Sequence, residues 1–307
     1  MHFSVVIPTY NRAPLLARTL ESVWRQQFRD YEVIVVDDGS NDGTQTYLQN
    51  LDNKVRYVRQ ANCGPGAARN TGIQQARGDY VALLDSDDLW FPWSLDVFAH
   101  AIREHRRPHI VGGKFVEFTK ETELLTIRDD TYETSWFNDY IGSSHYPYYV
   151  GSGTCVLRRD ALTGIRFLED RLNAEDHDLI LQMGDLPGFV RVVAPVTLAW
   201  RRHSASETGD FVSVVSGAQR LLSRERSGAY AGGAKRSRER HRILARSIRP
   251  AALACARKGE LKQGWQLYRS IFCWNVGLGH WRYLFAFPIL AGWGLFKRAI
   301  TRIPRPA

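Results

Sequence analysis

The sequence predicts an α/β fold with a mostly parallel sheet flanked by helices, followed by a basic, aromatic-rich helical extension. Three observations support this fold class. Short apolar runs alternate with segments of helical spacing along the first part of the chain. Polar residues and glycines follow the ends of these runs. Basic and aromatic residues then accumulate after residue 217.

Four apolar runs in the first part have the length and composition of buried strands: residues 3–7, 31–36, 55–58 and 80–84. Helical spacing follows the first three of them: residues 15–24, 44–51 and 67–76. Strands and helices that alternate in this way are joined by right-handed crossovers and pair in parallel. We therefore expect residues 1–118 to form a nucleotide-binding half.

Further along, the pattern predicts a helix over residues 92–105 and strands over residues 109–118, 151–157 and 190–200. Residues 119–150 mix acids with aromatic residues and receive no assignment. We expect residues 1–210 to form one domain, whose second half is residues 119–210. Residues 217–307 are expected to form a separate helical region with a loose turn near residues 229–234.

Composition indicates an ordinary globular protein, with 44% hydrophobic and 24% charged residues. The four cysteines are scattered and form no Cys-x-x-Cys pair, which argues against a disulfide framework or a thiolate zinc site. Strand-like sequence begins directly after Met1 and His2, so we expect no signal peptide. These features predict a cytoplasmic protein.

The net charge of +9 is unevenly distributed along the chain. Residues 217–307 carry 19 Lys and Arg residues and three acids, a net charge of +16, whereas residues 1–216 carry a net charge of −7. An acidic first part and a strongly basic second part predict two modules with different partners.

Three carboxylates, Asp85, Asp87 and Asp88, directly follow the apolar run at residues 80–84. Ligands of open α/β sheets bind beyond the carboxyl ends of strands, where these acids project. Carboxylates repel one another near a core, and their oxygens suit a hard divalent cation that also takes phosphate oxygens. The alternative is that Asp87 or Asp88 caps the following helix. The group of three acids favours the metal site.

Other strand ends carry further candidates. Asp37 and Asp38 follow the second predicted strand and are suited to a base or ribose, while Arg69 follows a glycine-rich turn. Turn formation and helix capping explain the two acids equally well. The chain has no Gly-x-Gly-x-x-Gly after its first strand and no phosphate-binding Gly-x-x-x-x-Gly-Lys-Ser/Thr loop. A dinucleotide oxidoreductase or a P-loop nucleotidase is therefore disfavoured.

Two candidates lie later in the chain. Asp176 belongs to the run Glu175-Asp176-His177-Asp178 in the first turn of an amphipathic helix. Helix dipoles favour acids at this position, and a carboxylate held there is also suited to act as a general base. His203 follows a predicted strand and two arginines, where it is placed to bind a metal or a phosphate.

Five motifs in order resemble those of the family 2 inverting glycosyltransferases of the GT-A fold, which use nucleotide-diphosphate sugars. They are Ile7-Pro8-Thr9-Tyr10-Asn11, Val36-Asp37-Asp38-Gly39-Ser40, Gly66-Ala67-Ala68-Arg69-Asn70, Leu84-Asp85-Ser86-Asp87-Asp88 and Glu175-Asp176-His177-Asp178-Leu179. The resemblance covers about residues 3–205.

The resemblance implies roles for individual residues. Residues expected to contact the donor nucleotide are Pro8, Tyr10, Asp37, Asp38, Arg69, Asp85 and Ser86. Residues expected to bind Mg²⁺ or Mn²⁺ are Asp85, Asp87 and His203. Asp176 matches the catalytic base. The implied reaction is a single in-line displacement in which an acceptor hydroxyl attacks the anomeric carbon and the nucleotide diphosphate leaves.

The implied partners are a nucleotide-diphosphate sugar, most often with uracil as its base, and a glycan or lipid-linked glycan acceptor in cell-surface polysaccharide synthesis. A second enzyme hypothesis is transfer of the sugar onto a polyprenyl phosphate. A hypothesis of another class is nucleic-acid binding through the basic region, since its net charge attracts phosphate backbones. The aromatic residues there lie in apolar runs and are not interleaved with polar residues, so no nucleic acid is expected.

The most apolar part of the basic region, residues 283–296, is interrupted by Pro288 and shorter than the roughly 20 residues that cross a bilayer. Lys297, Arg298, Arg302 and Arg305 follow it. This pattern predicts a peripheral anchor at the inner surface of a membrane. The alternative is a helical hairpin that packs against the catalytic domain.

Overall fold

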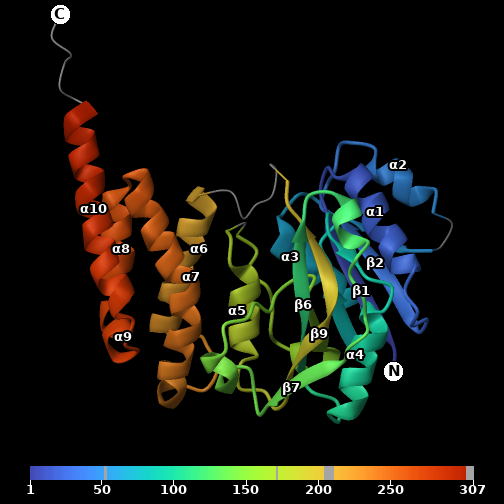
Figure 1. The fold of residues 1–307 in the computed structure, drawn as a ribbon. Helices are drawn as coiled ribbons and strands as arrows, with labels where there is room; N and C mark the ends of the chain where they lie inside the picture. The colour runs from blue at the N-terminus through green and yellow to red at the C-terminus, as the bar shows by residue number, and fades with distance from the viewer. Residues whose placement is uncertain (52–53, 171, 204–210, 302–307) are drawn as a thin grey trace, which may run out of the picture. The chain divides into compact units, whose positions relative to one another are not determined.

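A computed structural model describes residues 1–51, 54–170, 172–203 and 211–301 (Figure 1). The chain divides into two compact units. The first comprises Met1–Ser143, Tyr148–Arg171 and Glu175–Ala205. The second comprises Ser144–Pro147, Leu172–Ala174 and Ser206–Ala307.

The first unit is built on a nine-stranded sheet with the order β3-β2-β1-β4-β8-β6-β9-β5, in which β7 pairs with β9. The strands of its first part are β1 (Phe3–Thr9), β2 (Tyr31–Asp37), β3 (Arg56–Arg59) and β4 (Tyr80–Leu83). All three pairings among them are parallel. Because parallel strands point the same way, their carboxyl ends form one edge of the sheet.

The remaining strands make the sheet mixed. They are β5 (Leu89–Trp90), β6 (Ile110–Phe118), β7 (Glu133–Phe137), β8 (Cys155–Arg158) and β9 (Phe189–Arg201). β8 lies antiparallel between β4 and β6. β6 and β9 pair in parallel, whereas β5 and β7 run antiparallel to β9. The parallel arrangement predicted from helix–strand alternation is therefore that of the first four strands.

Helices of the first unit cover the sheet (Figure 1). They are α1 (Ala13–Trp24), α2 (Thr44–Gln49), α3 (Pro65–Gln75), α4 (Ser94–Glu104) and α5 (Glu175–Gln182). Two short 3₁₀ helices, η1 (Glu121–Leu124) and η3 (Arg159–Leu162), lie in the connections of this unit. A third is η2 (Gly142–His145). Both η1 and η2 lie within residues 119–150, for which the sequence predicts no element.

The core explains why α1 and α3 lie where they do. Leu16, Leu20 and Val23 are fully buried on one face of α1, at helical spacing, and each contributes roughly 1.5–3 kcal/mol through burial. Helix α3 packs very closely against the sheet at Gly72. A Cβ atom at Gly72 would lie 2.3 Å from Cγ1 of Val6 in β1, so only glycine permits this contact.

Residues 151–154, which we expected to begin a strand, form a turn before β8. Gly153 has a φ of +79°, in the left-handed region that strands do not use. The strand that follows, β8, is therefore shorter at its start than the predicted residues 151–157.

The second unit is helical. Its helices are α6 (Phe211–Arg226), η5 (Ala234–Arg236), α7 (Ser237–Lys258), α8 (Leu261–Ser270), α9 (Phe272–Gly277) and α10 (Trp281–Thr301). The expected loose turn lies between α6 and α7, where Gly228, Gly232 and Gly233 have positive φ. Among the helices that the structure describes, none combines the length and apolarity that crossing a lipid bilayer requires.

A buried ion pair joins α6 to α7. Arg240 binds Glu225 through two hydrogen bonds of 2.8 and 3.0 Å, and the two side chains are only 4% and 6% exposed. Nη1 of Arg240 also donates to the carbonyls of Ala231 and Gly233, which fixes the turn between the helices. Although burial opposes ionisation, His241 and Arg240 lower the pKa of Glu225.

Glu225→Gln should lower the free energy of unfolding of the helical unit by about 3 kcal/mol or more, because it leaves the buried Arg240 without its counter-charge. Chemical denaturation at pH 7, followed by circular dichroism, measures this loss. The control is Glu239→Gln, which removes a partly exposed pair with Arg236 and should cost less than about 1 kcal/mol.

The loss should also depend on pH. Because the folded protein lowers the pKa of Glu225 below its ordinary value of 4.5, this stabilisation is present above that pH and disappears as the pH falls below it. The difference between wild type and Glu225→Gln should therefore shrink in acid. Equal stabilities of the two proteins at pH 7 would contradict the role given to this pair.

Candidate active site

The predicted acids after β4 lie in a tight turn at the carboxyl edge of the parallel strands. The amide of Leu84 still donates to Val6 of β1, and the amide of Asp88 donates to the carbonyl of Asp85. Asp88 is buried, and its Oδ1 accepts a hydrogen bond of 2.9 Å from the amide of Arg201. Asp88 therefore joins this turn to the end of β9, and burial raises its pKa well above the usual value.

Asp87 and His203 are brought together. His203 Nε2 lies 2.9 Å from Oδ2 of Asp87, although 116 positions separate the two residues in the chain. The same oxygen accepts a hydrogen bond of 2.8 Å from Arg12 at the start of α1. Arg201 in β9 donates to the backbone carbonyl of Asp87 and so holds the turn in place. A carboxylate oxygen and an imidazole nitrogen thus converge at the sheet edge.

Asp85 faces a different partner. Its Oδ1 accepts a hydrogen bond of 2.8 Å from Nη2 of Arg69 in α3. In the part of the chain that the structure describes, no three His, Cys, Asp or Glu side chains converge closely enough to hold a metal ion. The protein therefore offers Asp87 and His203 as a pair, and Asp85 is not grouped with them.

The carboxylate of this pair suits Mg²⁺ or Mn²⁺. These ions prefer oxygen ligands, and Mg²⁺ is commonly held by one or two carboxylates together with water and substrate phosphates. Asp87 and His203 provide such a partial set of ligands. The remaining ligands would come from a diphosphate and from water.

Arg69 links the two acidic segments of the site. Its Nη1 donates to Oε1 of Glu175 at the start of α5, and its Nη2 donates to Asp85, both at 2.8 Å. The guanidinium is 6% exposed and also lies over the ring of Phe167. Arg69 was predicted to contact the donor nucleotide. In the structure, it bridges two carboxylates from segments about 90 positions apart.

Asp176, the predicted base, is held by hydrogen bonds on both carboxylate oxygens. Tyr149 Oη donates to Oδ2 at 2.9 Å, the Ser152 amide donates to Oδ2, and Ser152 Oγ donates to Oδ1 at 2.8 Å. A Cβ atom at Gly151 would lie 2.1 Å from Tyr149 Oη, so this close arrangement requires glycine. The cage fixes the carboxylate in one orientation.

The two neighbouring acids have opposite pKa shifts. Burial acts to raise the pKa of Asp176, but Arg69 and the hydrogen bonds from Ser152 and Tyr149 lower it overall. The pKa of Glu175 is raised to about 7, because the effect of burial is larger than the opposing effect of Arg69. Asp176 is therefore the acid that stays fully ionised at neutral pH.

Tyr149 and Ser152 were missed by the sequence reasoning. Tyr149 is one of many aromatic residues within residues 119–150, and the pattern of residues 151–157 predicts a strand for Ser152. The only local signal was Gly151-Ser152-Gly153, a small-residue run that also indicates a turn.

The remaining predicted residues lie around the parallel strands. Buried Asp37 accepts hydrogen bonds from the Ser40 amide and from Arg59. Asp38 accepts hydrogen bonds from the amides of Cys63 and Gly64, which it holds in the glycine-rich turn. Both acids thus shape the loops at this edge of the sheet, as the turn-forming alternative describes, and neither is the N-cap of α2 or α3.

Three further residues were predicted to contact the donor. Pro8 is buried within β1, Ser86 is buried in the turn between Asp85 and Asp87, and Tyr10 is exposed just after β1. All three lie in or directly after parallel strands. No hydrogen bond within the described residues ties the Tyr10 side chain to another element.

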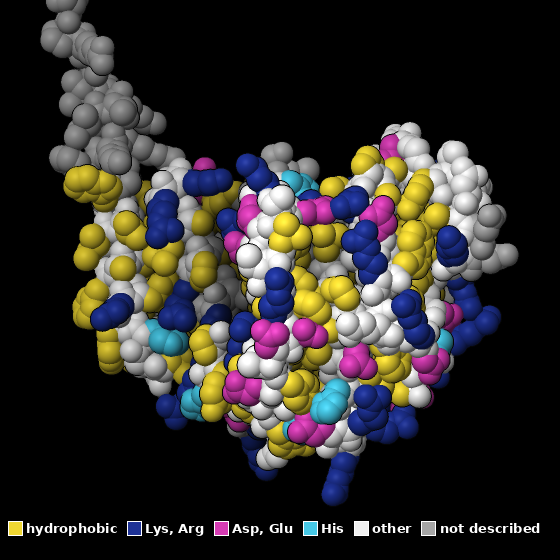
Figure 2. Space-filling view, turned by 45° about the vertical axis from the view of Figure 1, so that its right-hand side comes forward, with side chains coloured by type: hydrophobic (Ala, Val, Ile, Leu, Met, Phe, Trp, Pro, Cys, Tyr) yellow, Lys and Arg dark blue, Asp and Glu magenta, His cyan; other side chains and the backbone are white. Residues whose placement is uncertain are grey.

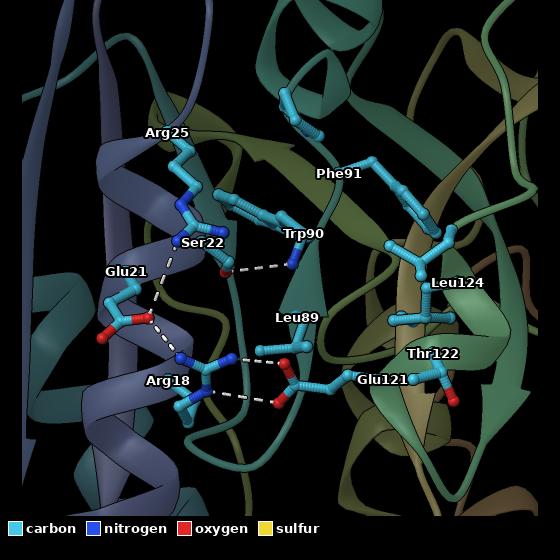
Figure 3. A pocket seen from close by; sticks show the side chains of 13 residues that line it. Arg18, Glu21, Ser22, Arg25, Leu89, Trp90, Phe91, Glu121, Thr122 and Leu124 are labelled. Carbon is cyan, nitrogen blue, oxygen red and sulfur yellow. Dashed lines mark hydrogen bonds and ion pairs between the residues drawn. The ribbon is translucent and has the colours of Figure 1, made fainter.

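A cavity of about 370 Å³ lies on another part of this unit, between α1, β5 and η1 (Figure 3). Its lining is mostly apolar and includes Leu89, Phe91 and Leu124. At its rim, Glu121 pairs with Arg18, and the same carboxylate accepts a hydrogen bond from Arg201 (Figure 3 shows the pair with Arg18). None of the predicted site residues lines this cavity.

The fold and the acids at its sheet edge define a glycosyltransferase of the GT-A type. The family model described as "Glycosyl transferase family 2" matches residues 4–165. The chain belongs to this family, which confirms the resemblance found in the sequence.

Curated relatives match parts of the chain. A GalNAc(5)-diNAcBac-PP-undecaprenol β-1,3-glucosyltransferase from Campylobacter jejuni is 36% identical over 119 residues, which cover 37% of this chain and 38% of the relative. An uncharacterised protein of Sinorhizobium fredii is 32% identical over 211 residues, or 66% of this chain and 23% of that protein. The matches cover between 16% and 38% of the length of the first three curated relatives.

Two solved structures share the fold. TarS residues 1–349 of S. aureus, in complex with UDP-GlcNAc, align with a TM-score of 0.69 at 22% identity over 89% of this chain and 80% of that chain. The mannosyltransferase PcManGT of Pyrobaculum calidifontis, in complex with GDP-Man and Mn²⁺, aligns with a TM-score of 0.53 at 20% identity over 95% and 87%. At these identities the likeness establishes the fold alone.

Arg69→Met should destabilise the protein by about 3 kcal/mol, because it leaves the partly buried carboxylates of Asp85 and Glu175 without a counter-charge. Chemical denaturation measures the loss. Arg25→Met removes the same charge at an exposed, loosely paired position and should cost less than about 1 kcal/mol.

A second variant separates charge from packing. Adding Glu175→Gln to Arg69→Met removes one of the two unpaired charges and should recover part of the lost stability. If Arg69→Met were no more costly than Arg25→Met, the bridge would not hold these segments together.

Proposed function

We propose that the chain transfers a sugar from a nucleotide-diphosphate sugar to a hydroxyl of a glycan or lipid-linked glycan, with inversion at the anomeric carbon and with Mg²⁺ or Mn²⁺. The observation that carries this proposal is the set of acids beyond one sheet edge. Asp87 is paired with His203, and Asp176 is caged in its ionised form and linked through the Glu175–Arg69–Asp85 bridge to the same turn.

The related proteins support the choice of substrates. TarS was solved with UDP-GlcNAc and the Pyrobaculum enzyme with GDP-Man and Mn²⁺, so proteins of this fold bind nucleotide sugars and one was obtained with a divalent ion. The name of the Campylobacter relative describes an undecaprenol-linked glycan. A uridine nucleotide and a lipid-linked acceptor are therefore our first choices for donor and acceptor.

In the proposed reaction, the acceptor oxygen forms a bond to the anomeric carbon as the bond from that carbon to the nucleotide diphosphate breaks. The leaving diphosphate takes the electron pair of the broken bond. Asp176 takes the proton of the acceptor hydroxyl. Its lowered pKa keeps it ionised at neutral pH, and the hydrogen bonds from Tyr149 and Ser152 keep its carboxylate in one orientation.

Asp87 and His203 would hold the divalent ion, which supplies positive charge against the negative charge of the leaving diphosphate. Arg12 and Arg201 keep Asp87 in position by binding its carboxylate and its backbone carbonyl. Arg69 keeps Asp85 and Glu175 paired, so that their charges do not repel the diphosphate. The loops shaped by Asp37 and Asp38 border the same edge, where the nucleotide would lie.

Asp87→Ala should abolish metal-dependent binding of the donor, because it removes the carboxylate of the Asp87–His203 pair. Calorimetric titration with UDP-sugars, in Mn²⁺ and then in EDTA, measures the effect. Asp130→Ala, at an exposed position outside the site, should bind as the wild type does. Wild-type binding that is equally tight in EDTA would contradict the metal role.

Asp176→Asn should reduce turnover by roughly a hundredfold or more while donor binding persists, because the amide keeps the shape of the side chain but cannot accept the proton. Steady-state assays of sugar transfer, with donor affinity measured separately, test this. Glu175→Gln is the matched comparison, since it changes the adjacent acid in the same way and should lose much less activity. A larger loss for Glu175→Gln would assign the base to Glu175.

A further inference from the structure

α10 has two apolar faces. Its inner face is buried within the helical unit and contains Tyr283, Leu284, Phe287 and Ala291. Its outer face carries large apolar side chains that recur every four residues and are 55%, 69%, 70% and 58% exposed: Trp281, Phe285, Ile289 and Trp293. We call these four residues the outer stripe. Residues four apart lie on one side of a helix, so the stripe is continuous along α10.

The inner face is sufficient to attach α10 to its own unit. The ring of Phe287 stacks on Tyr268 of α8 with centroids 4.6 Å apart, and it meets Trp265 edge-on at 5.1 Å. Tyr268 Oη also donates to the carbonyl of Leu284. Gly264 lies opposite, where a Cβ atom would be only 3.3 Å from the Phe287 ring. The outer stripe takes no part in these contacts.

Further exposed apolar residues lie on the neighbouring helix α9. α9 contacts α10, and on α9 the side chains of Phe272 and Val276 are also exposed, again four residues apart. Figure 2 shows hydrophobic side chains in a column below the grey C-terminal residues, with Lys and Arg side chains nearby. A large exposed apolar surface of this kind marks a site of interaction with another molecule or a membrane.

The charge around the stripe identifies the kind of partner. Exposed Arg282 lies next to Trp281 at one end, and beyond Trp293 the chain continues with Lys297 and Arg298. Residues 217–307 as a whole carry a net charge of +16. A second copy of this region would bring the same charge and be repelled, whereas anionic lipid attracts it.

The residue types and dimensions agree with a lipid surface. Tryptophan, which occupies both ends of the stripe, is enriched where membranes meet water. The stripe covers one side of the helix over 12 residue steps, or about 18 Å at 1.5 Å per residue. A one-sided stripe suits a helix that lies in the plane of the interface.

We propose that the outer stripe of α10 docks the helical unit onto an anionic lipid bilayer, with α10 parallel to the membrane plane. Phe285 and Ile289 enter the boundary between headgroups and acyl chains, and exposed Arg282 and the positive charge of residues 217–307 attract anionic headgroups. This inference does not depend on the proposed sugar-transfer reaction.

The test is flotation of the full chain with vesicles of phosphatidylcholine alone or with about 30% phosphatidylglycerol, at about 0.15 M salt. The wild type should float with the anionic vesicles and much less with the neutral ones. Phe285→Gln/Ile289→Gln should reduce binding to anionic vesicles at least about tenfold, because each side chain contributes apolar area only at the interface.

The matched control is Leu125→Gln/Val212→Gln, which replaces two side chains that are 70% and 68% exposed elsewhere on the chain. This variant should float as the wild type does. Unchanged thermal midpoints for both double variants would show that the fold is intact. Binding by Phe285→Gln/Ile289→Gln that equals wild-type binding would overturn the proposal.

Binding of the outer stripe to a second copy of the chain, or of the basic region to DNA, would give different results from binding to lipid. If the wild type forms dimers without vesicles, and Phe285→Gln/Ile289→Gln makes it monomeric, the stripe is an interface between copies and the lipid proposal is wrong. Retention on duplex DNA at about 0.15 M salt without flotation would likewise overturn it. Because flotation needs no donor, acceptor or metal, failure here leaves the proposed reaction untouched, and an inactive chain that floats leaves this inference intact.

Discussion

The site depends on one buried guanidinium. Arg69 reaches from α3 to Asp85 after β4 and to Glu175 at the start of α5, and so joins three segments that are distant in the chain. Carboxylates this close would otherwise repel one another in a poorly solvated region, and one or more would be protonated. A lysine could not replace Arg69, because a single ammonium lacks the planar fork that serves two partners in fixed directions. Arg69 therefore offsets the charges of Asp85 and Glu175, and together with the hydrogen bonds from Ser152 and Tyr149 it lowers the pKa of Asp176.

Acids of the same type therefore have different functions that their surroundings determine. The carboxylates of Asp38 and Asp88 accept hydrogen bonds from backbone amides. Asp38 thereby holds the glycine-rich turn, and Asp88 holds the end of β9. Asp87 shares one oxygen between Arg12 and His203 and lies at the edge of the turn. Asp176 accepts three hydrogen bonds, which stabilise its charged form and restrict its rotation. A carboxylate that is ionised and oriented before the substrate arrives needs little reorganisation during proton transfer.

The sequence predicted the first four strands and their parallel pairing, because apolar runs of strand length alternate there with helices. It also placed the acids at the strand ends, where the structure has them. It could not predict that Arg69 binds Asp85 and Glu175, since that pairing joins positions 16 and 106 residues away. The cage around Asp176 was missed for the same reason: Tyr149 and Ser152 have no local pattern that distinguishes them, and the turn at residues 151–154 depends on the positive φ of Gly153. Local periodicity reports which face is buried, but it carries no information on which side chains meet across the fold.

The apolar run at residues 283–296 shows why composition left two alternatives open. A helix that is apolar on all sides is expected in a core or in a membrane, and the sequence presents the two as exclusive. The structure divides the run between two faces: Tyr283 and Phe287 pack within the helical unit, while Phe285 and Ile289 remain exposed between them. The inner face packs on α8 within the helical unit. The outer face then has no role in that packing, and leaving so much apolar surface in water is unfavourable by roughly 25 cal/mol per Å². An apolar medium that covers the stripe would remove this cost, and the net charge of +16 on residues 217–307 favours an anionic lipid surface for that medium.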